Sequence, residues 1–176
     1  MGAKRSVLEI RQFYDRWAPL VSTFCRLYMG EATTAEYVTA EAFLDYFRRE
    51  LPLRLDHVPV ALMSLALLQS VQRGGGEIEV YSRFELAVLG LAPEVRAVFI
   101  LHGVLEVQLP WITAITGTSY RDVCRLWGKA LLDLQEYLDY VGDLRRFDSC
   151  ELAPKPRRDG NMRFEELLLT KKFAKA

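Results

Sequence analysis

The stretch LPWITAITGTSYRDVCRLWGKALLDL, residues 109–134, contains two short segments with apolar residues at helical spacing, separated by Gly117. Ser119 opens the second segment and Asp122 follows three residues later, a pattern typical of a helix N-cap. From there one face of the expected helix is apolar at a period of 3.6 residues, and basic residues fall on the other face. The stretch therefore predicts a helix-turn-helix. The residues of its second helix that are expected to face the core are Val123, Leu126, Trp127, Ala130, Leu131 and Leu134.

Helical periodicity also dominates the rest of the chain, and strand alternation is nearly absent, so the predicted fold class is all-α. The first periodic segment contains Pro19, which is expected to kink or split a helix that Gly30 then ends. Thr33 or Thr34 is the expected N-cap of the next helix. The predicted helices are 7–27, 33–51, 58–73 and 92–106, and a further helix is predicted to begin near Phe84.

Three consecutive glycines, Gly74 to Gly76, lie in RGGGEIEVYSR between the third helix and the next helical segment. A glycine-rich loop that cradles phosphates needs a strand before it and a helix after it, and no strand is predicted before this one. The glycines are therefore interpreted as a linker. The chain is predicted to form two small helical domains, the second a helix-turn-helix, in the order 1–73, a short linker at 74–84, 85–148, and a tail at 149–176.

The composition argues against several classes of function. The 23 basic residues are balanced by 23 acidic ones, so extensive nucleic-acid wrapping is not expected, although local basic faces remain open. Cys25, Cys124 and Cys150 are far apart, and His57 and His102 do not cluster with them, so neither a metal site nor a cofactor is predicted. Because no triad, metal set or phosphate loop can be assembled, the chain is not expected to be an enzyme.

Cysteine usage and the apolar segments predict a cytoplasmic protein without a membrane partner. An odd number of cysteines with no disulfide framework fits a reducing compartment. The N-terminal MGAKRSVLEIRQF lacks the long apolar core of a signal peptide. The most apolar run, VPVALMSLALLQSV at 58–71, is too short to span a bilayer and is interpreted as a buried helix.

Two separated segments resemble one family. The C-terminal segment, residues 86–134, resembles the last domain of bacterial sigma factors, which reads the minus-thirty-five promoter element. The matching positions are Leu91, Pro93, Arg96, Val98, Phe99, Leu101, Ile112, Thr113, Gly117, Val123, Lys129 and Ala130. The N-terminal FYDRWAPLVSTFCRLYMG (13–30) and AEYVTAEAFL (35–44) are similar to the core-polymerase-binding domain of that family. The two segments, in this order along the chain, are similar to the extracytoplasmic-function group of sigma factors.

The resemblance implies a transcription initiation factor whose partners are core RNA polymerase and promoter DNA, with an anti-sigma or activating protein as a further partner. Base edges and phosphates would be contacted from the start of the second helix of the helix-turn-helix. The expected DNA-binding residues are Ser119, Tyr120, Arg121, Arg125 and Lys129. The expected polymerase-binding residues are Tyr37, Ala40, Glu41 and Leu44.

The third helix departs from the family pattern. In ALMSLALLQSVQRGGG (61–76), Leu68 replaces an amide side chain and Arg73 is the one remaining basic residue. Promoter melting requires a flipped base to be caught by stacking and hydrogen bonds, and a cationic surface along the strand. Weakened melting of the minus-ten element is therefore expected.

Two other interpretations remain open. In the first, the chain is a sigma-derived interaction module that does not read DNA. Its anchors for another protein would be Trp111, Trp127 and the tail segment FEELLLTKKF (164–173). That tail segment is either disordered or a docking helix that orders on binding. The second is a conventional two-component or repressor-type DNA-binding protein. Its dimerisation would need a symmetric helical face, and the N-terminal resemblance argues against it.

Overall fold

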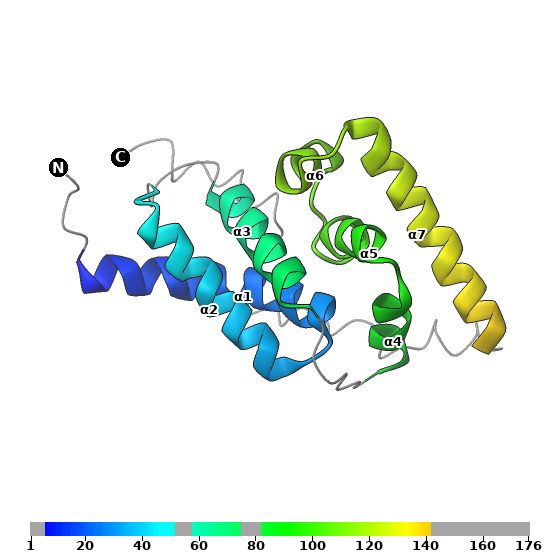
Figure 1. Ribbon diagram of the computed structural model, residues 1–176, viewed down its shortest axis with the longest axis horizontal. Helices are drawn as coiled ribbons and strands as arrows, with labels where there is room; N and C mark the ends of the chain where they lie inside the picture. Colours follow the sequence, from blue (N-terminus) through cyan, green and yellow to red (C-terminus); the bar gives the residue numbers. More distant parts are fainter. Residues whose placement is uncertain (1–5, 52–57, 75–81, 142–176) are drawn as a thin grey trace.

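The computed structural model describes residues 6–51, 58–74 and 82–141, and within these ranges all regular secondary structure is helical. The first helix group comprises α1 (Val7–Met29), α2 (Ala32–Arg48) and α3 (Val58–Arg73). The second comprises α4 (Arg83–Gly90), α5 (Pro93–Phe99), the π-helical turn η1 (Ile100–Val104), α6 (Leu109–Thr116) and α7 (Tyr120–Val141). The two groups lie side by side, with α7 along the outer edge of the second (Figure 1). The predicted all-α fold class is confirmed for the described ranges.

Local signals define the ends of α1. Ser6 and Glu9 form a reciprocal capping box at its start, and Gly30 ends it in the left-handed conformation at φ 76°. The predicted split at Pro19 does not occur, because α1 continues through this residue. Pro19 lies on the exposed side of the helix, where water can satisfy the carbonyl of Asp15 that loses its helical donor.

The predicted cap of α2 is wrong. The helix begins at Ala32 with Glu31 at the N-cap position, so Thr33 and Thr34 lie inside the first turn. The Thr34 hydroxyl instead hydrogen-bonds the Glu31 carboxylate. Gly30 and Glu31 alone connect α1 to α2, so the N-cap position falls on Glu31. Pro52, which follows the predicted helix, lies outside the described residues.

The first helix of the second group begins at Arg83, close to the predicted start near Phe84, and the group contains an irregular turn. Ser82 caps α4 through the backbone N–H of Glu85, so Arg83 and Phe84 are helical rather than part of the linker. Pro93 occupies the first turn of α5, as predicted. The helix expected over 92–106 is interrupted, because α5 passes directly into η1 and Leu105 donates to the Ile100 carbonyl five residues back. The tail and residues 75–81 of the predicted linker lie outside the described ranges.

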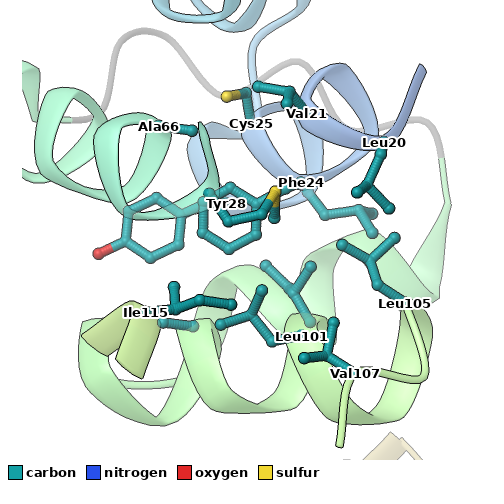
Figure 2. Close-up of a cluster of buried hydrophobic side chains, with 14 of the residues drawn as sticks. Leu20, Val21, Phe24, Cys25, Tyr28, Ala66, Leu101, Leu105, Val107 and Ile115 are labelled. Carbon is teal, nitrogen blue, oxygen red and sulfur yellow. The ribbon is translucent and has the colours of Figure 1, made fainter. Parts of the chain in front are cut away.

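One hydrophobic core runs through both helix groups. Besides packing on α2 and α3, α1 contacts α4, α5 and η1, while α3 contacts α6. Figure 2 shows Leu20, Phe24 and Tyr28 of α1 lying between that helix and the ribbon that carries Leu101 and Leu105. The two helix groups therefore share one buried interior. Across the residues placed by the structure, no helix has the length and apolar character needed to cross a membrane.

Candidate nucleic-acid interface

The predicted helix-turn-helix corresponds to α6, a three-residue turn and α7. Gly117 ends α6 in the left-handed conformation at φ 70°, and its N–H donates to the Thr113 carbonyl at 2.9 Å. The Ser119 hydroxyl accepts from the backbone N–H of Asp122 at 3.1 Å and donates to its carboxylate at 2.7 Å. The predicted cap is confirmed, and it fixes the direction in which α7 leaves the turn.

The inner side of α7 packs against the second helix group. Val123 and Ala130 are fully buried, while Leu126, Trp127 and Leu134 are partly buried against the core, as predicted. Leu131 is 47% exposed, so its assignment to the buried face is wrong. It lies about 80° around the helix from Val123 at about 100° per residue, which places it at the edge of the packed stripe.

Trp127 is a packing residue. Its ring stacks on Phe99 at 6.0 Å between centroids and meets the His102 ring edge-on at 4.7 Å. Gly103 makes this approach possible, because a Cβ there would lie 3.2 Å from the Trp127 ring. His102 is itself held by a 2.8 Å hydrogen bond between Nδ1 and the Val107 carbonyl. Trp127 therefore fastens α7 to the π-helical turn.

All five predicted DNA-binding residues lie on α7 or directly before it. We call this set the α7 basic face, and each member is exposed: Ser119, Tyr120, Arg121, Arg125 and Lys129. Asp122 reduces its positive charge, because one carboxylate oxygen lies 3.6 Å from Arg125 Nε. A hydrogen bond with the Cys124 side chain raises the pKa of the exposed Tyr120 phenol. The face presents three cations beside one acidic residue.

Gly128 is a half-buried residue of α7, and a Cβ there would meet no atom within 4 Å. Gly128→Ala is therefore expected to raise the free energy of unfolding by about 0.5–1 kcal/mol, because glycine is a poor helix former. Chemical denaturation measures the change. Gly117→Ala is the matched control and should destabilise the protein, since residue 117 has φ 70°. A Gly128→Ala protein less stable than wild type would contradict the expectation.

The predicted polymerase-binding residues lie together on α2. We call them the α2 ridge: Tyr37, Ala40, Glu41 and Leu44. Tyr37 and Leu44 are 48% and 44% exposed, and Ala40 is exposed. Glu41 is half-buried beside them. The ridge therefore combines exposed apolar surface with one carboxylate.

Two arginines that were not among the predicted polymerase-binding residues adjoin the α2 ridge. Arg48 Nη1 lies 3.7 Å from the Glu41 carboxylate and 3.2 Å from that of Asp45. The Arg73 guanidinium lies 3.8 Å from the centre of the Tyr37 ring, a cation–π contact between α3 and α2. The seven-residue spacing from Glu41 to Arg48 would have placed Arg48 on the same helix face.

The two surfaces are not brought together. The α2 ridge belongs to the first helix group, whereas the α7 basic face lies on the outer helix of the second (Figure 1). Between them, α3 packs against α1, α2 and α6 and exposes Leu68 and Val71. The helix expected to open DNA thus shows apolar side chains, and Arg73 at its end stacks on Tyr37.

The Cys25 thiol and the possible metal ligands are the other chemically reactive groups in the described part of the chain. Burial raises the pKa of the Cys25 thiol to about 11, which keeps it protonated and unreactive near neutral pH. No group of three His, Cys, Asp or Glu side chains within these ranges is arranged to hold a metal ion. Comparison of the chain with protein-family models and with curated proteins finds no match.

Proposed function

We propose that this chain is a sigma-like transcription initiation factor. It binds core RNA polymerase through the α2 ridge and recognises a minus-thirty-five promoter element with the α7 basic face. It acts by recruitment and positioning, without covalent chemistry. The observation that carries the proposal is the α6–Gly117–α7 arrangement, in which Arg121, Arg125 and Lys129 are exposed opposite the buried Val123. A recognition helix needs this combination of a fixed turn and an open basic face.

The small positive charge of the α7 basic face supports a factor that needs core RNA polymerase for part of its affinity for promoter DNA. Three cations neutralise about three phosphates, which corresponds to a log–log salt slope of roughly −2.7. The Asp122 carboxylate beside Arg125 lowers the attraction further. Such a face supplies modest DNA affinity, so the polymerase contributes the rest. The apolar outer surface of α3 supports weakened melting of the minus-ten element.

Arg121→Ala with Arg125→Ala is expected to weaken duplex DNA binding about tenfold at moderate salt and to reduce the salt slope to roughly −0.9. Fluorescence anisotropy with a labelled promoter fragment measures both quantities. Arg11→Ala with Arg83→Ala removes the same charge from exposed positions on α1 and α4 and should leave both values near wild type. Equal losses in the two double variants would show that the α7 basic face is not the DNA contact.

Association with core RNA polymerase tests the other half of the proposal. A pull-down at moderate salt should retain the wild-type chain, and Tyr37→Ala with Leu44→Ala should reduce its retention. Both side chains are nearly half exposed, so their truncation leaves the buried interior intact. The absence of any association between folded wild-type chain and active core enzyme would refute the sigma-like function.

A second candidate is a sigma-derived interaction module that binds another protein and does not read promoter DNA. The continuous core favours this alternative, because it holds α3 against α6 and keeps the two helix groups together. The anisotropy measurement separates the candidates. Polymerase association without DNA binding by the wild-type chain would support the interaction module.

A further inference from the structure

One flank of α7 carries no charge and lies apart from the side that packs against the core. Its residues follow the alternating spacing of four and three residues that joins two helices in a coiled coil. We call them the α7 seam: Cys124, Gly128, Leu131 and Gln135. At about 100° per residue, the centre of the seam lies about 110° around the helix from the buried Val123. The seam is therefore a surface of its own, distinct from the packed side of α7.

The α7 seam is open at its middle. Leu131 is 47% exposed. Three residues before it, a Cβ added to Gly128 would meet no atom within 4 Å. Gln135 is exposed and Cys124 is half-buried. The seam thus offers a large apolar side chain and, next to it, a place where a second apolar side chain can lie against the helix backbone.

Charged residues border the α7 seam, and their sign changes along the helix. Arg125 lies beside the N-terminal half of the seam and Glu136 beside its C-terminal half, and both are exposed. At about 100° per residue they lie only about 20° apart around the helix, on the same side of the seam. In a parallel pair of α7 helices like charges would meet, whereas in an antiparallel pair each arginine meets the glutamate of the other copy. The charges therefore favour a second copy of α7 that runs in the opposite direction.

The spacing within the α7 seam sets the register of such a pair. When Leu131 lies over Gly128 of the second copy, twofold symmetry places the leucine of that copy over the glycine of the first. In this register Arg125 lies within one turn of Glu136 of the second copy. The seam is more than a right angle away from the packed side, and α7 lies along the outer edge of the molecule (Figure 1), so the remainder of each chain points away from the other.

We propose that the α7 seam is a self-association surface, through which two copies of the chain pair by antiparallel α7 helices, and that the paired chain does not read DNA. The dimer follows from the geometry of α7 alone, whereas its consequence for DNA binding rests on the proposed sigma-like function. Two packed helices whose axes are about 8–10 Å apart are together about 20 Å wide, and the major groove is about 12 Å wide. The groove admits one helix, so pairing and promoter recognition exclude each other.

The α7 seam is too small for a permanent dimer. Because α7 has 22 residues, a contact along it is about 33 Å long and about 10 Å wide, which covers roughly 330 Å² on each copy. Stable complexes bury about 800 Å² on each partner. The dimer should therefore dissociate in the micromolar range, and the concentration of the chain decides between the paired form and the monomer that reads DNA.

Sedimentation velocity of the full chain at about 1–300 μM tests the pairing. The wild-type chain should shift from monomer to dimer over this range. Leu131→Glu should raise the dissociation constant at least about tenfold, because it buries a carboxylate in the pair. Leu68→Glu is the matched control, since Leu68 is 43% exposed but belongs to α3, and it should leave the dissociation constant unchanged. Arg125→Glu should weaken pairing about tenfold, and the further change Glu136→Arg should restore it.

Cysteine variants test the antiparallel register. In a Cys124→Ser and Cys150→Ser background, chains with Gly128→Cys are mixed with chains with Leu131→Cys and oxidised. The mixture should form disulfide-linked heterodimers about tenfold faster than either variant links to itself, because positions 128 and 131 face each other across the pair. Cys25 does not compete, since burial raises its pKa to about 11. The linked heterodimer should bind a promoter fragment about tenfold more weakly than the same chains after reduction.

Several results would overturn the proposal. A monomer at every concentration would refute the dimer and leave the α7 seam to residues 142–176 or to a different protein. Loss of pairing in Leu68→Glu, or no recovery when the charges of residues 125 and 136 are exchanged, would refute the antiparallel α7 pair. Undiminished DNA binding by the linked heterodimer would refute the exclusion of DNA. Absence of DNA binding by the dilute wild-type monomer would instead refute promoter reading and leave the dimer in place.

Discussion

Phe24→Ala is expected to lower the free energy of unfolding by about 3–5 kcal/mol, the range for a fully buried aromatic residue replaced by alanine. Phe24 has no exposed surface, stacks on Tyr28 at 5.6 Å and lies in the part of the core shared by both helix groups. The substitution leaves a cavity where α1 meets η1. Because the core is continuous, both groups should lose stability together.

Guanidinium denaturation followed by tryptophan fluorescence and far-ultraviolet circular dichroism measures this effect. Trp17 reports on the first helix group, and Trp111 and Trp127 report on the second. Phe43→Ala is the matched control, since Phe43 is equally buried but packs against Phe13, Tyr14 and Phe47 of the first group. A loss below about 1 kcal/mol for Phe24→Ala beside a large loss for Phe43→Ala would mean that the groups fold independently.

Arg96→Ala should destabilise the protein by about 3 kcal/mol, because hydrogen bonds from a charged donor contribute more than neutral ones and their loss leaves carbonyls unsatisfied. Arg96 donates to the Tyr28 carbonyl at 2.8 Å and the Leu91 carbonyl at 3.0 Å, and it also contacts the Leu89 carbonyl. These carbonyls lie at the C-terminal ends of α1 and α4, where helical partners are missing and positive charge is favourable. Burial lowers the pKa of the Arg96 guanidinium.

Arg96→Lys separates geometry from charge. A lysine retains the positive charge but cannot reach carbonyls in several directions with a planar fork, so it should recover less than half of the lost stability. Arg121→Ala, which removes an arginine from the exposed α7 basic face, is the control for loss of charge and should change the free energy of unfolding by less than about 0.5 kcal/mol. Wild-type stability for Arg96→Ala would show that water replaces the guanidinium.

Features that depend on neighbouring residues were predicted well. Gly30 and Gly117 end their helices in the left-handed conformation, and Ser119 caps α7, because each signal acts within one turn of the chain. The incorrect assignment of the α2 N-cap to Thr33 or Thr34 also arises from signals that act within one turn of the chain. Several residues in that stretch are able to cap a helix, and the two-residue connection formed by Gly30 and Glu31 decided where α2 begins.

The shared core was not predictable from periodicity. A helical pattern shows which face of α1 is apolar, but it does not show which other helix covers that face. Phe24 and Tyr28 fit a self-contained first domain as well as they fit contact with Leu101 and Leu105. Only the fold shows that α1 has neighbours in both helix groups.

For the candidate interface, the sequence predicted which residues would be exposed, but it did not predict the contacts that the side chains make. The residues of the α7 basic face are exposed, as a DNA contact requires, but their role stays a prediction. The Asp122–Arg125 ion pair and the Arg73–Tyr37 contact were missed. The first depends on rotamers along α7, and the second depends on the packing of α3 beside α2.

The π-helical turn η1 has a consequence for insertions and deletions. A π turn holds one residue more than the α-helical turn it replaces, so the chain from Ile100 to Val104 carries a single-residue insertion directly after α5. Removing one residue there would restore a regular helix and rotate everything after it by about 100°. Gly103 would then no longer face Trp127, and α6 and α7 would leave in a new direction. The length of this five-residue segment therefore sets the angular register of the whole helix-turn-helix.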